Sequence, residues 1–247
     1  MMCGILGILR FDNKKIKEID LKNFTLSLNH RGPDGNGIYL NKENQIGFGH
    51  TRTTIFDISN KGAQPMSYAN QRYWITFNGT IYNFIEIKKD LEVLGHKFRS
   101  STDTEVILAA YVEWGEKCQF KFNGDWAFAI WDEVEKNLFV SCDRFGTKPL
   151  YYIQNNNYFI FASELKAFMY LKDELRPDFD HGFFLWLGKN HGSINTFLKN
   201  VFLLPGGFQI NINKNRKFIL EKWWKTIDNL IEIPKTYEDQ VLYFKDL

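Results

Sequence analysis

The chain has 247 residues, 44% of them hydrophobic and 17% aromatic, which is enough for a substantial buried core. Its 31 basic and 29 acidic residues are interspersed and give a net charge of +2, so the sequence offers no basic stripe for nucleic acid and no polybasic membrane anchor. No apolar run approaches the ~20 residues of a membrane span, and no signal peptide is recognisable. Three cysteines without ligand spacing argue against a disulfide framework or a metal site. We therefore expect a cytoplasmic protein that acts on a small molecule.

Strands and helices are predicted to alternate in the first half of the chain. Residues 3–11 form a near-continuous apolar run, typical of a strand buried on both faces. Periodicity and turn residues predict helices over 16–29, 81–94 and 102–115 and strands over 36–40, 45–51 and 72–78. Thr102 and Glu105 have the spacing of a capping box, which places Asp103 in the first turn of its helix.

The second half is predicted to be mostly strands, until a helix begins at Thr236. Four strands are expected within 124–163 and two more near 207–212 and 216–223, each bounded by Gly, Asn or Pro. Segregated blocks of this kind predict an α+β fold in which two sheets are layered with helices outside. We expect one domain over 1–225, followed by a linker and the start of a helix over 226–247.

Cys3 lies almost at the α-amine of the chain, which suits an N-terminal nucleophile. A thiol has an ordinary pKa of ~8.5 and needs a base to become a thiolate at neutral pH, and a free α-amine with a pKa near ~8 is such a base. This role requires removal of Met1 and Met2. The enzyme that trims initiator methionine needs a small second residue, so a chain that starts at Met1 keeps both, whereas one that starts at Met2 would expose Cys3. The alternative is that Cys3 is a small apolar residue opening a strand.

Further polar residues next to glycines or at helix starts predict an amino-acid site. Arg52 can hold a carboxylate through two parallel hydrogen bonds, although a surface ion pair is the alternative. Asp103 can accept from an ammonium group or simply compensate the helix dipole. Asn78 and Gly79 can donate to an oxyanion, or form a tight Asn-Gly turn.

Other polar residues are expected to support the fold rather than the chemistry. Asp143 and its charged neighbours in DRFGTK have no helix-opening glycine pattern after them, so a structural charge cluster is expected. His30 and His50 neighbour the proposed site in the sequence, and each is expected to be a hydrogen-bonded scaffold residue rather than a base.

Several motifs together resemble one family. They are CGI at 3–5, HRGPDG at 30–35, GAQP at 62–65, NGTIYN at 78–83, TDTEVIL at 102–108, DRFGTKPLYY at 143–152 and ASELKAF at 162–168. The chain resembles the class II glutamine amidotransferase domain of glutamine-hydrolysing asparagine synthetases. The resemblance implies a four-layer α-β-β-α sandwich of two antiparallel sheets, as in N-terminal nucleophile hydrolases.

The resemblance also implies roles for residues of this site. Cys3 would attack the side-chain amide of glutamine to give a thioester and ammonia, and Asn78 with Gly79 would bind the oxyanion. Arg52 would hold the α-carboxylate and Asp103 the α-ammonium. The backbone around Ile55 would line the same pocket.

One departure from the family pattern affects the ammonium site. Thr80 stands where the family usually has glutamate, so it can offer a hydroxyl but no charge, and glutamine affinity is expected to be poorer.

The resemblance further implies partners and cofactors outside this chain. No SGG-type ATP-pyrophosphatase loop occurs in it, so ATP and Mg²⁺ are expected in a C-terminal synthetase domain that uses the ammonia to amidate a carboxylate such as aspartate. The domain itself is expected to need no cofactor. A catalytically silent packing or dimerisation module, and a glutaminase of another class II branch, stay open as alternatives, as does a homodimer.

Overall fold

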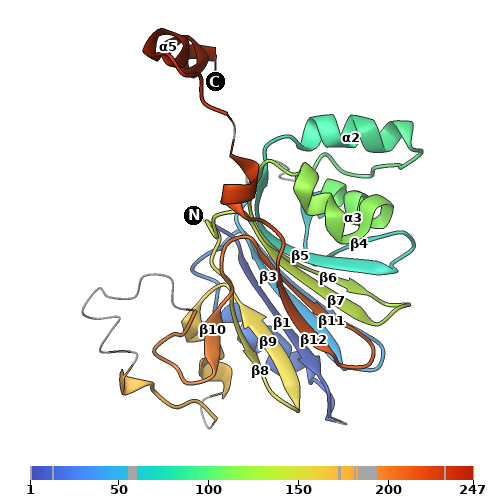
Figure 1. Ribbon diagram of the computed structural model, residues 1–247. Helices are drawn as coiled ribbons and strands as arrows, with labels where there is room; N and C mark the ends of the chain where they lie inside the picture. Colours follow the sequence, from blue (N-terminus) through green and yellow to red (C-terminus); the bar gives the residue numbers. More distant parts are fainter. Residues whose placement is uncertain are drawn as a thin grey trace.

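Two antiparallel sheets packed face to face form the centre of the molecule (Figure 1). The computed structural model describes residues 2–12, 14–54, 60–171, 174–180, 182, 194–230 and 232–246. Within these residues, sheet A has the strand order β10 (Val201–Leu203), β8 (Tyr151–Gln154), β9 (Tyr158–Ala162), β1 (Gly4–Arg10), β3 (Ile46–Arg52) and β2 (Gly35–Leu40). Sheet B has the order β12 (Phe218–Lys222), β11 (Phe208–Ile212), β7 (Asn137–Cys142), β6 (Gly124–Asp132), β5 (Tyr73–Ile81) and β4 (Met66–Tyr68).

Strand β1 lies in the middle of sheet A, between β3 and β9. Its pairing with β3 places Gly4 opposite Thr51, so Cys3 lies beside the end of β3. Residues 4–9 are all buried, because one face of the strand meets sheet B and the other meets the outer helices. This two-sided burial explains why the segment is a continuous apolar run rather than an alternating one.

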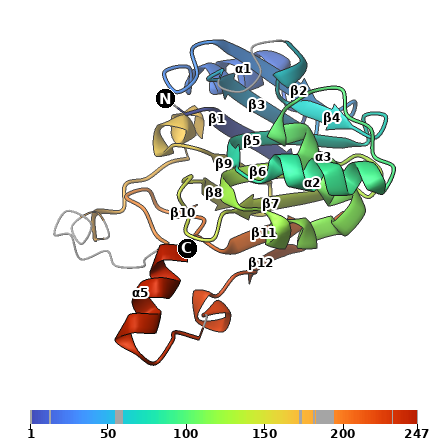
Figure 2. The ribbon, with the colours of Figure 1, turned by 90° about the horizontal axis from the view of Figure 1, so that it is seen from above.

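Helices cover the outer face of each sheet (Figures 1 and 2). Helix α1 (Glu18–Leu26) and the 3₁₀ segment η3 (Leu165–Leu171) pack on sheet A, with Leu21, Phe24 and Phe168 fully or almost fully buried. On sheet B lie α2 (Phe84–Val93), α3 (Asp103–Trp114) and the 3₁₀ segment η2 (Gly115–Lys121). A third apolar cluster, which includes Phe48 and Val140, fills the space between the sheets. The predicted four-layer sandwich is confirmed.

Some details differ from the sequence-based expectations. Strands β4 and β10 were not predicted, because three-residue strands are too short to show a period. The capping box at Thr102 is only half formed. The Thr102 hydroxyl accepts from the Glu105 N–H at 3.4 Å, but the Glu105 carboxylate accepts from the N–H groups of Arg99 and Ser100 instead of Thr102.

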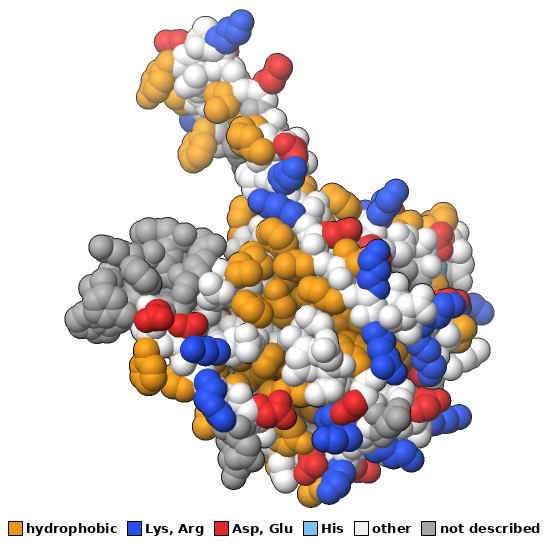
Figure 3. All heavy atoms as spheres, turned by 60° about the horizontal axis from the view of Figure 1, so that its bottom comes forward, with side chains coloured by type: hydrophobic (Ala, Val, Ile, Leu, Met, Phe, Trp, Pro, Cys, Tyr) orange, Lys and Arg blue, Asp and Glu red, His pale blue; other side chains and the backbone are white. Residues whose placement is uncertain are grey.

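The last described segment projects away from the sandwich (Figure 2). It contains the 3₁₀ turn η4 (Thr226–Asn229) and helix α5 (Tyr237–Asp246), and every described residue from 225 to 246 is exposed except Pro234, which is partly buried. Helix α5 exposes apolar side chains, among them Tyr237, Leu242 and Phe244 (Figure 3). Among the described residues no helix is both long and apolar enough to cross a membrane. The boundary at residue 225 stays a prediction.

Asp143 organises the loop that follows β7. It is 1% exposed, and its carboxylate accepts the backbone N–H groups of Trp126, Phe145, Thr147 and Lys148 at 2.9 to 3.2 Å. These four bonds hold the DRFGTK segment in place against β6. Asp143 thus has a structural role, but it acts through backbone N–H groups rather than through the charge cluster that the sequence predicted.

Replacing Asp143 with alanine should lower the free energy of unfolding by about 3 kcal/mol, because several buried N–H groups would lose their acceptor. Urea denaturation measures this change. Asp90→Ala, on the exposed face of α2, is the control and should change stability by less than about 0.5 kcal/mol. Equal effects of the two substitutions would contradict the role given to Asp143.

Candidate active site

A hollow at one end of the sandwich brings together residues from both sheets and from helix α3. Cys3 precedes β1, Arg52 ends β3, Gly79 lies in β5 and Asp103 is the first residue of α3. The described residues that line the hollow are Cys3, His50, Arg52, Thr53, Gly62, Gln64, Phe77, Gly79, Thr102, Asp103 and Thr104. Chain segments that are distant in sequence therefore form one polar site.

Cys3 is fixed by bonds to its thiol and to its carbonyl group. The N–H of Thr53 donates to Sγ at 3.4 Å, and Arg31 Nε donates to the Cys3 carbonyl oxygen at 3.0 Å. Arg31 also pairs with Glu164 at 2.9 Å, and Glu164 contacts His30 at 3.0 Å. The predicted scaffold role of His30 agrees with this bond.

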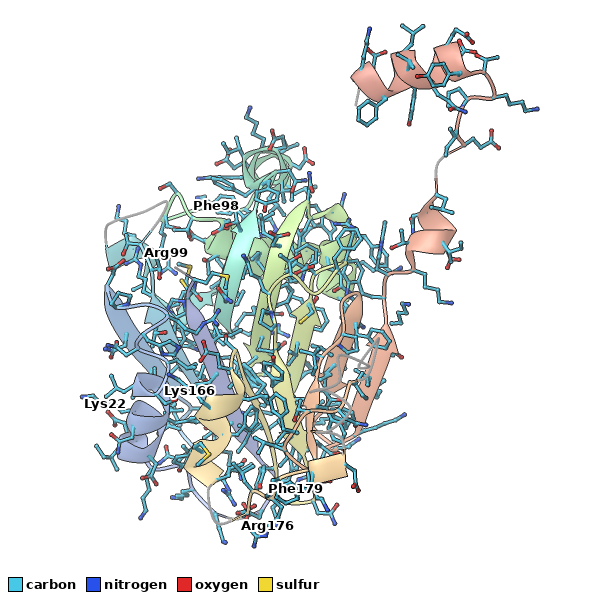
Figure 4. The ribbon with its side chains drawn as sticks, turned by 90° about the vertical axis from the view of Figure 1, so that its left-hand side faces the viewer. Lys22, Phe98, Arg99, Lys166, Arg176 and Phe179 are labelled. Carbon is cyan, nitrogen blue, oxygen red and sulfur yellow. The ribbon has the colours of Figure 1, made fainter. Side chains whose placement is uncertain are left out.

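This network of ion pairs and hydrogen bonds ends at the outer layer on sheet A. Lys166 Nζ lies 2.9 Å from His30 Nδ1, and Figure 4 shows Lys166 on segment η3. The network therefore connects the backbone of the candidate nucleophile to an outer element of the fold.

Burial raises the pKa of the Cys3 thiol above its usual value. The hydrogen bond from Thr53 and the charges of Arg52 and Arg31 act in the opposite direction. The net effect keeps the thiol protonated at neutral pH. In the sequence as given, the Cys3 nitrogen is an amide bonded to Met2 and is not a base.

Asn78 and Gly79 lie inside strand β5, paired with Ala127 and Trp126 of β6. The tight Asn-Gly turn considered from the sequence is therefore wrong: the strand continues to Ile81. Asn78 is 2% exposed, and its Nδ2 has no hydrogen-bond acceptor among the described residues. A Cβ at Gly79 would lie 2.1 Å from the Asp125 carbonyl oxygen, so only glycine fits. Gly79 lines the hollow together with Cys3, and Asn78 is its neighbour in the strand.

Asp103 is 5% exposed, and its Oδ2 accepts from the Ile81 N–H at 3.1 Å. Burial raises the pKa of this carboxyl to about 6, although backbone N–H groups of Ile81, Thr104 and Asp103 itself favour the ionised form. An ammonium group in the hollow would favour the ionised form further.

His50, expected from the sequence to be a scaffold residue, is buried in the wall of the hollow. Burial lowers the pKa of its imidazole to about 3, and the Arg52 charge adds to this effect, so the ring is neutral. Its Nε2 has no hydrogen-bond partner among the described residues. The ring can therefore accept or donate one hydrogen bond but cannot supply a charge near neutral pH.

The hollow contains most of the residues that the sequence singled out. Cys3, Arg52, Gly79 and Asp103 line it, and Asn78 is the strand neighbour of Gly79. Thr80 is not among the described lining residues, and Ile55 lies outside the described residues.

Sequence reasoning missed several lining residues. Gln64, Phe77 and Thr104 were given no part in the site, although the GAQP motif includes Gln64 and the TDTEVIL motif includes Thr104. No group of three or more His, Cys, Asp or Glu side chains that could hold a metal ion occurs within the described part of the chain.

The family follows from the fold, the site and the sequence taken together. Residues 2–224 match the family of the glutamine amidotransferase domain, and the chain belongs to this family. Among solved structures, the allosteric regulatory enzyme of purine biosynthesis has a TM-score of 0.68 at 20% identity, over 90% of this chain and 49% of that one. Glutamine phosphoribosylpyrophosphate amidotransferase from Bacillus subtilis has a TM-score of 0.64 at 20% identity, over the same shares. At this identity both establish the fold alone.

Two curated relatives are more similar in sequence. Asparagine synthetase [glutamine-hydrolyzing] 1 of Bacillus subtilis is 39% identical over 180 residues, which are 72% of this chain and 28% of that protein. A putative asparagine synthetase [glutamine-hydrolyzing] 2 of Methanocaldococcus jannaschii is 41% identical over 188 residues, covering 70% of this chain and 36% of that protein. The chain thus spans only about a third of the length of these relatives.

The raised pKa of Asp103 gives a prediction for stability against pH. The folded state holds the Asp103 proton more tightly than the unfolded chain does. The stabilisation that this proton gives the folded state is therefore fully present below about pH 4 and is lost as pH rises through about 6. Relative to Asp103→Asn, the wild-type free energy of unfolding should fall by about 3 kcal/mol between pH 4 and 7, at about 1.4 kcal/mol per pH unit. Urea denaturation of both proteins across this range measures the difference, and a constant difference would contradict the raised pKa.

Proposed function

We propose that this domain hydrolyses glutamine through Cys3 and supplies ammonia to an ATP-dependent amidation. The Cys3 sulfur attacks the side-chain carbonyl carbon, and the amide nitrogen leaves as ammonia with the proton taken from the thiol. Water then cleaves the γ-glutamyl thioester and releases glutamate. The observation that carries the proposal is the Asn78 Nδ2 donor, buried and unpaired within the described residues beside the Gly79 position, because a developing oxyanion is the partner that such donors require.

The base in this proposal is the α-amine of Cys3, freed by removal of Met1 and Met2. The elevated pKa of the buried thiol supports this requirement, because neither the neutral His50 nor the cations Arg31 and Arg52 can take its proton near neutral pH. Arg31, bound to the Cys3 carbonyl, orients the residue without acting as a base.

Charge at the two sides of the hollow supports recognition of an α-amino acid. Arg52 binds the α-carboxylate and Asp103 the α-ammonium, with the backbone near Ile55 and the Thr80 hydroxyl as lesser contacts. Among the described residues that line the hollow, Asp103 is the one with a carboxylate. Asp103 therefore provides most of the ammonium recognition.

The names of the relatives support the destination of the ammonia. They are glutamine-hydrolysing asparagine synthetases with a large part that this chain does not match. In our proposal that part binds ATP and Mg²⁺ and amidates a carboxylate such as aspartate, while this domain needs no cofactor. The exposed apolar side chains of α5 supply a surface for packing against it. The sequence identities favour this branch over the purine-precursor branch, with which only the fold is shared.

Intact mass of the purified protein, before and after treatment with a diazo-ketone analogue of glutamine, tests the nucleophile. We expect a chain that starts at Cys3 to gain one adduct on that residue, and Cys3→Ala to gain none and to lose glutaminase activity. A chain that retains Met2 should stay unlabelled because it lacks the amine. A trimmed chain that does not react would contradict the proposal and would favour a catalytically silent packing module.

The proposed roles of Asp103 and Thr80 predict different effects of their substitution on the KM for glutamine. Asp103→Asn should raise the KM for glutamine by about thirtyfold, since a charge-assisted bond worth about 2 kcal/mol is lost. Thr80→Ala should change KM by less than about threefold, because a single neutral hydrogen bond is lost at most. Steady-state kinetics on trimmed protein measures both, and a larger effect at Thr80 would reverse the assignment.

A further inference from the structure

Gln64, in the GAQP motif, lies where the pairing of β4 with β5 stops. Met66 is opposite Ile75, and the same register continued backwards would place Gln64 opposite Phe77 and Gly62 opposite Gly79. The chain leaves the strand before that point. Phe77 nevertheless has its partner, because the Gln64 side-chain Oε1 accepts from the Phe77 N–H at 2.7 Å. The side chain replaces the backbone carbonyl that a longer β4 would have supplied.

The direction of the backbone N–H groups along β5 shows which donor faces the hollow. The Phe77 N–H points to Gln64 and the Ile81 N–H points to Asp103, so both face the same edge of the strand. Every second residue of an antiparallel strand directs its N–H to the same side, so Gly79 faces that edge as well. Gly79 lines the hollow, where a longer β4 would otherwise have lain. The donor proposed for the oxyanion is therefore available because strand pairing ends early.

The other end of the Gln64 amide reaches helix α3. Its Nε2 donates to the Thr104 hydroxyl at 3.3 Å, and Thr104 follows Asp103 directly. One buried side chain, 9% exposed, thus contacts the strand that carries the oxyanion donors and the helix turn that carries the ammonium-binding carboxylate. The backbone of Gln64 also lies close to β2. A Cβ at Gly37 would lie only 2.2 Å from the Gln64 carbonyl oxygen.

We propose that Gln64 is a positioning residue, which holds the open edge of β5 at Gly79 in register with Asp103. This inference rests on the proposed function of the site. Gln64 does not touch the reacting atoms. It fixes the distance between the donors that bind the oxyanion and the group that binds the substrate ammonium. Loss of its bonds shifts the donors away from the transition state, and so lowers kcat more than it raises KM.

The test compares Gln64→Met with Gln119→Met in trimmed protein. Gln119 is a matched control: it is 1% exposed, accepts from Ser141 Oγ at 2.7 Å and donates to Gln209, but it is not among the described lining residues. Both substitutions remove a buried amide of the same size. We expect Gln64→Met to lower kcat for glutamine by at least about tenfold with KM within about threefold, and Gln119→Met to leave both within about twofold.

The outcomes separate positioning from general stability. Equal kcat values for the two variants, each with a similar loss of thermal stability, would overturn the proposal. If Gln64→Met does not fold, Thr104→Val removes only the weaker of the two bonds and should still lower kcat/KM by about threefold.

Amide hydrogen exchange tests the positioning role of Gln64 independently of glutaminase activity. Wild-type protein without glutaminase activity would overturn the proposed function alone. The positioning role would then be decided by exchange at Ile81, whose N–H donates to Asp103 Oδ2, and at Glu105 in the first turn of α3. Faster exchange there in Gln64→Met, but not in Gln119→Met, supports it, and unchanged exchange overturns it.

Discussion

Burial of the apolar faces of the two sheets against each other is the interaction on which the site depends. It brings the end of β3 in sheet A next to β5 in sheet B, and the Thr76 hydroxyl donates across this interface to the Gly49 carbonyl at 3.1 Å. Cys3 and Arg52 come from one sheet, whereas Asn78 and Gly79 come from the other. Because the core is close-packed, small displacements between the sheets are resisted, and the two halves of the site keep their separation.

The same burial sets the electrostatic character of the hollow. It raises the pKa values of Cys3 and Asp103 and lowers that of His50, which shifts each group toward its neutral form, although a carboxyl with a pKa of about 6 is still mostly ionised at neutral pH. Arg52 and Arg31 partly oppose the rise at Cys3. In our proposal a bound amino acid places its ammonium group at the Asp103 carboxylate and its carboxylate at Arg52, so that both charges of the ligand are compensated. Such a site is costly for stability and suited to binding a zwitterion.

Interrupted secondary structure gives the site its donors. A β4 strand extended toward Gly62 would pair with the edge of β5 at Gly79, and the hollow would be filled by backbone. The Gln64 amide satisfies Phe77 and the Asp103 carboxylate satisfies Ile81, so the edge of β5 stays hydrogen-bonded on either side of the position left open. Buried polar side chains thus stand in for a strand without closing the site.

The longer helices and strands follow from apolar periodicity in the sequence, which is a property of short segments. Local motifs likewise predicted the four-layer class and the grouping of Cys3, Arg52, Gly79 and Asp103 in one site. The extended conformation of Asn78–Gly79 could not be read from the sequence, since pairing with β6 overrides the local turn preference of that dipeptide. Only the structure, too, revealed the neutral state of His50 and the bridging contacts of Gln64. Both result from burial and from neighbours that are remote in sequence, and no local pattern encodes them.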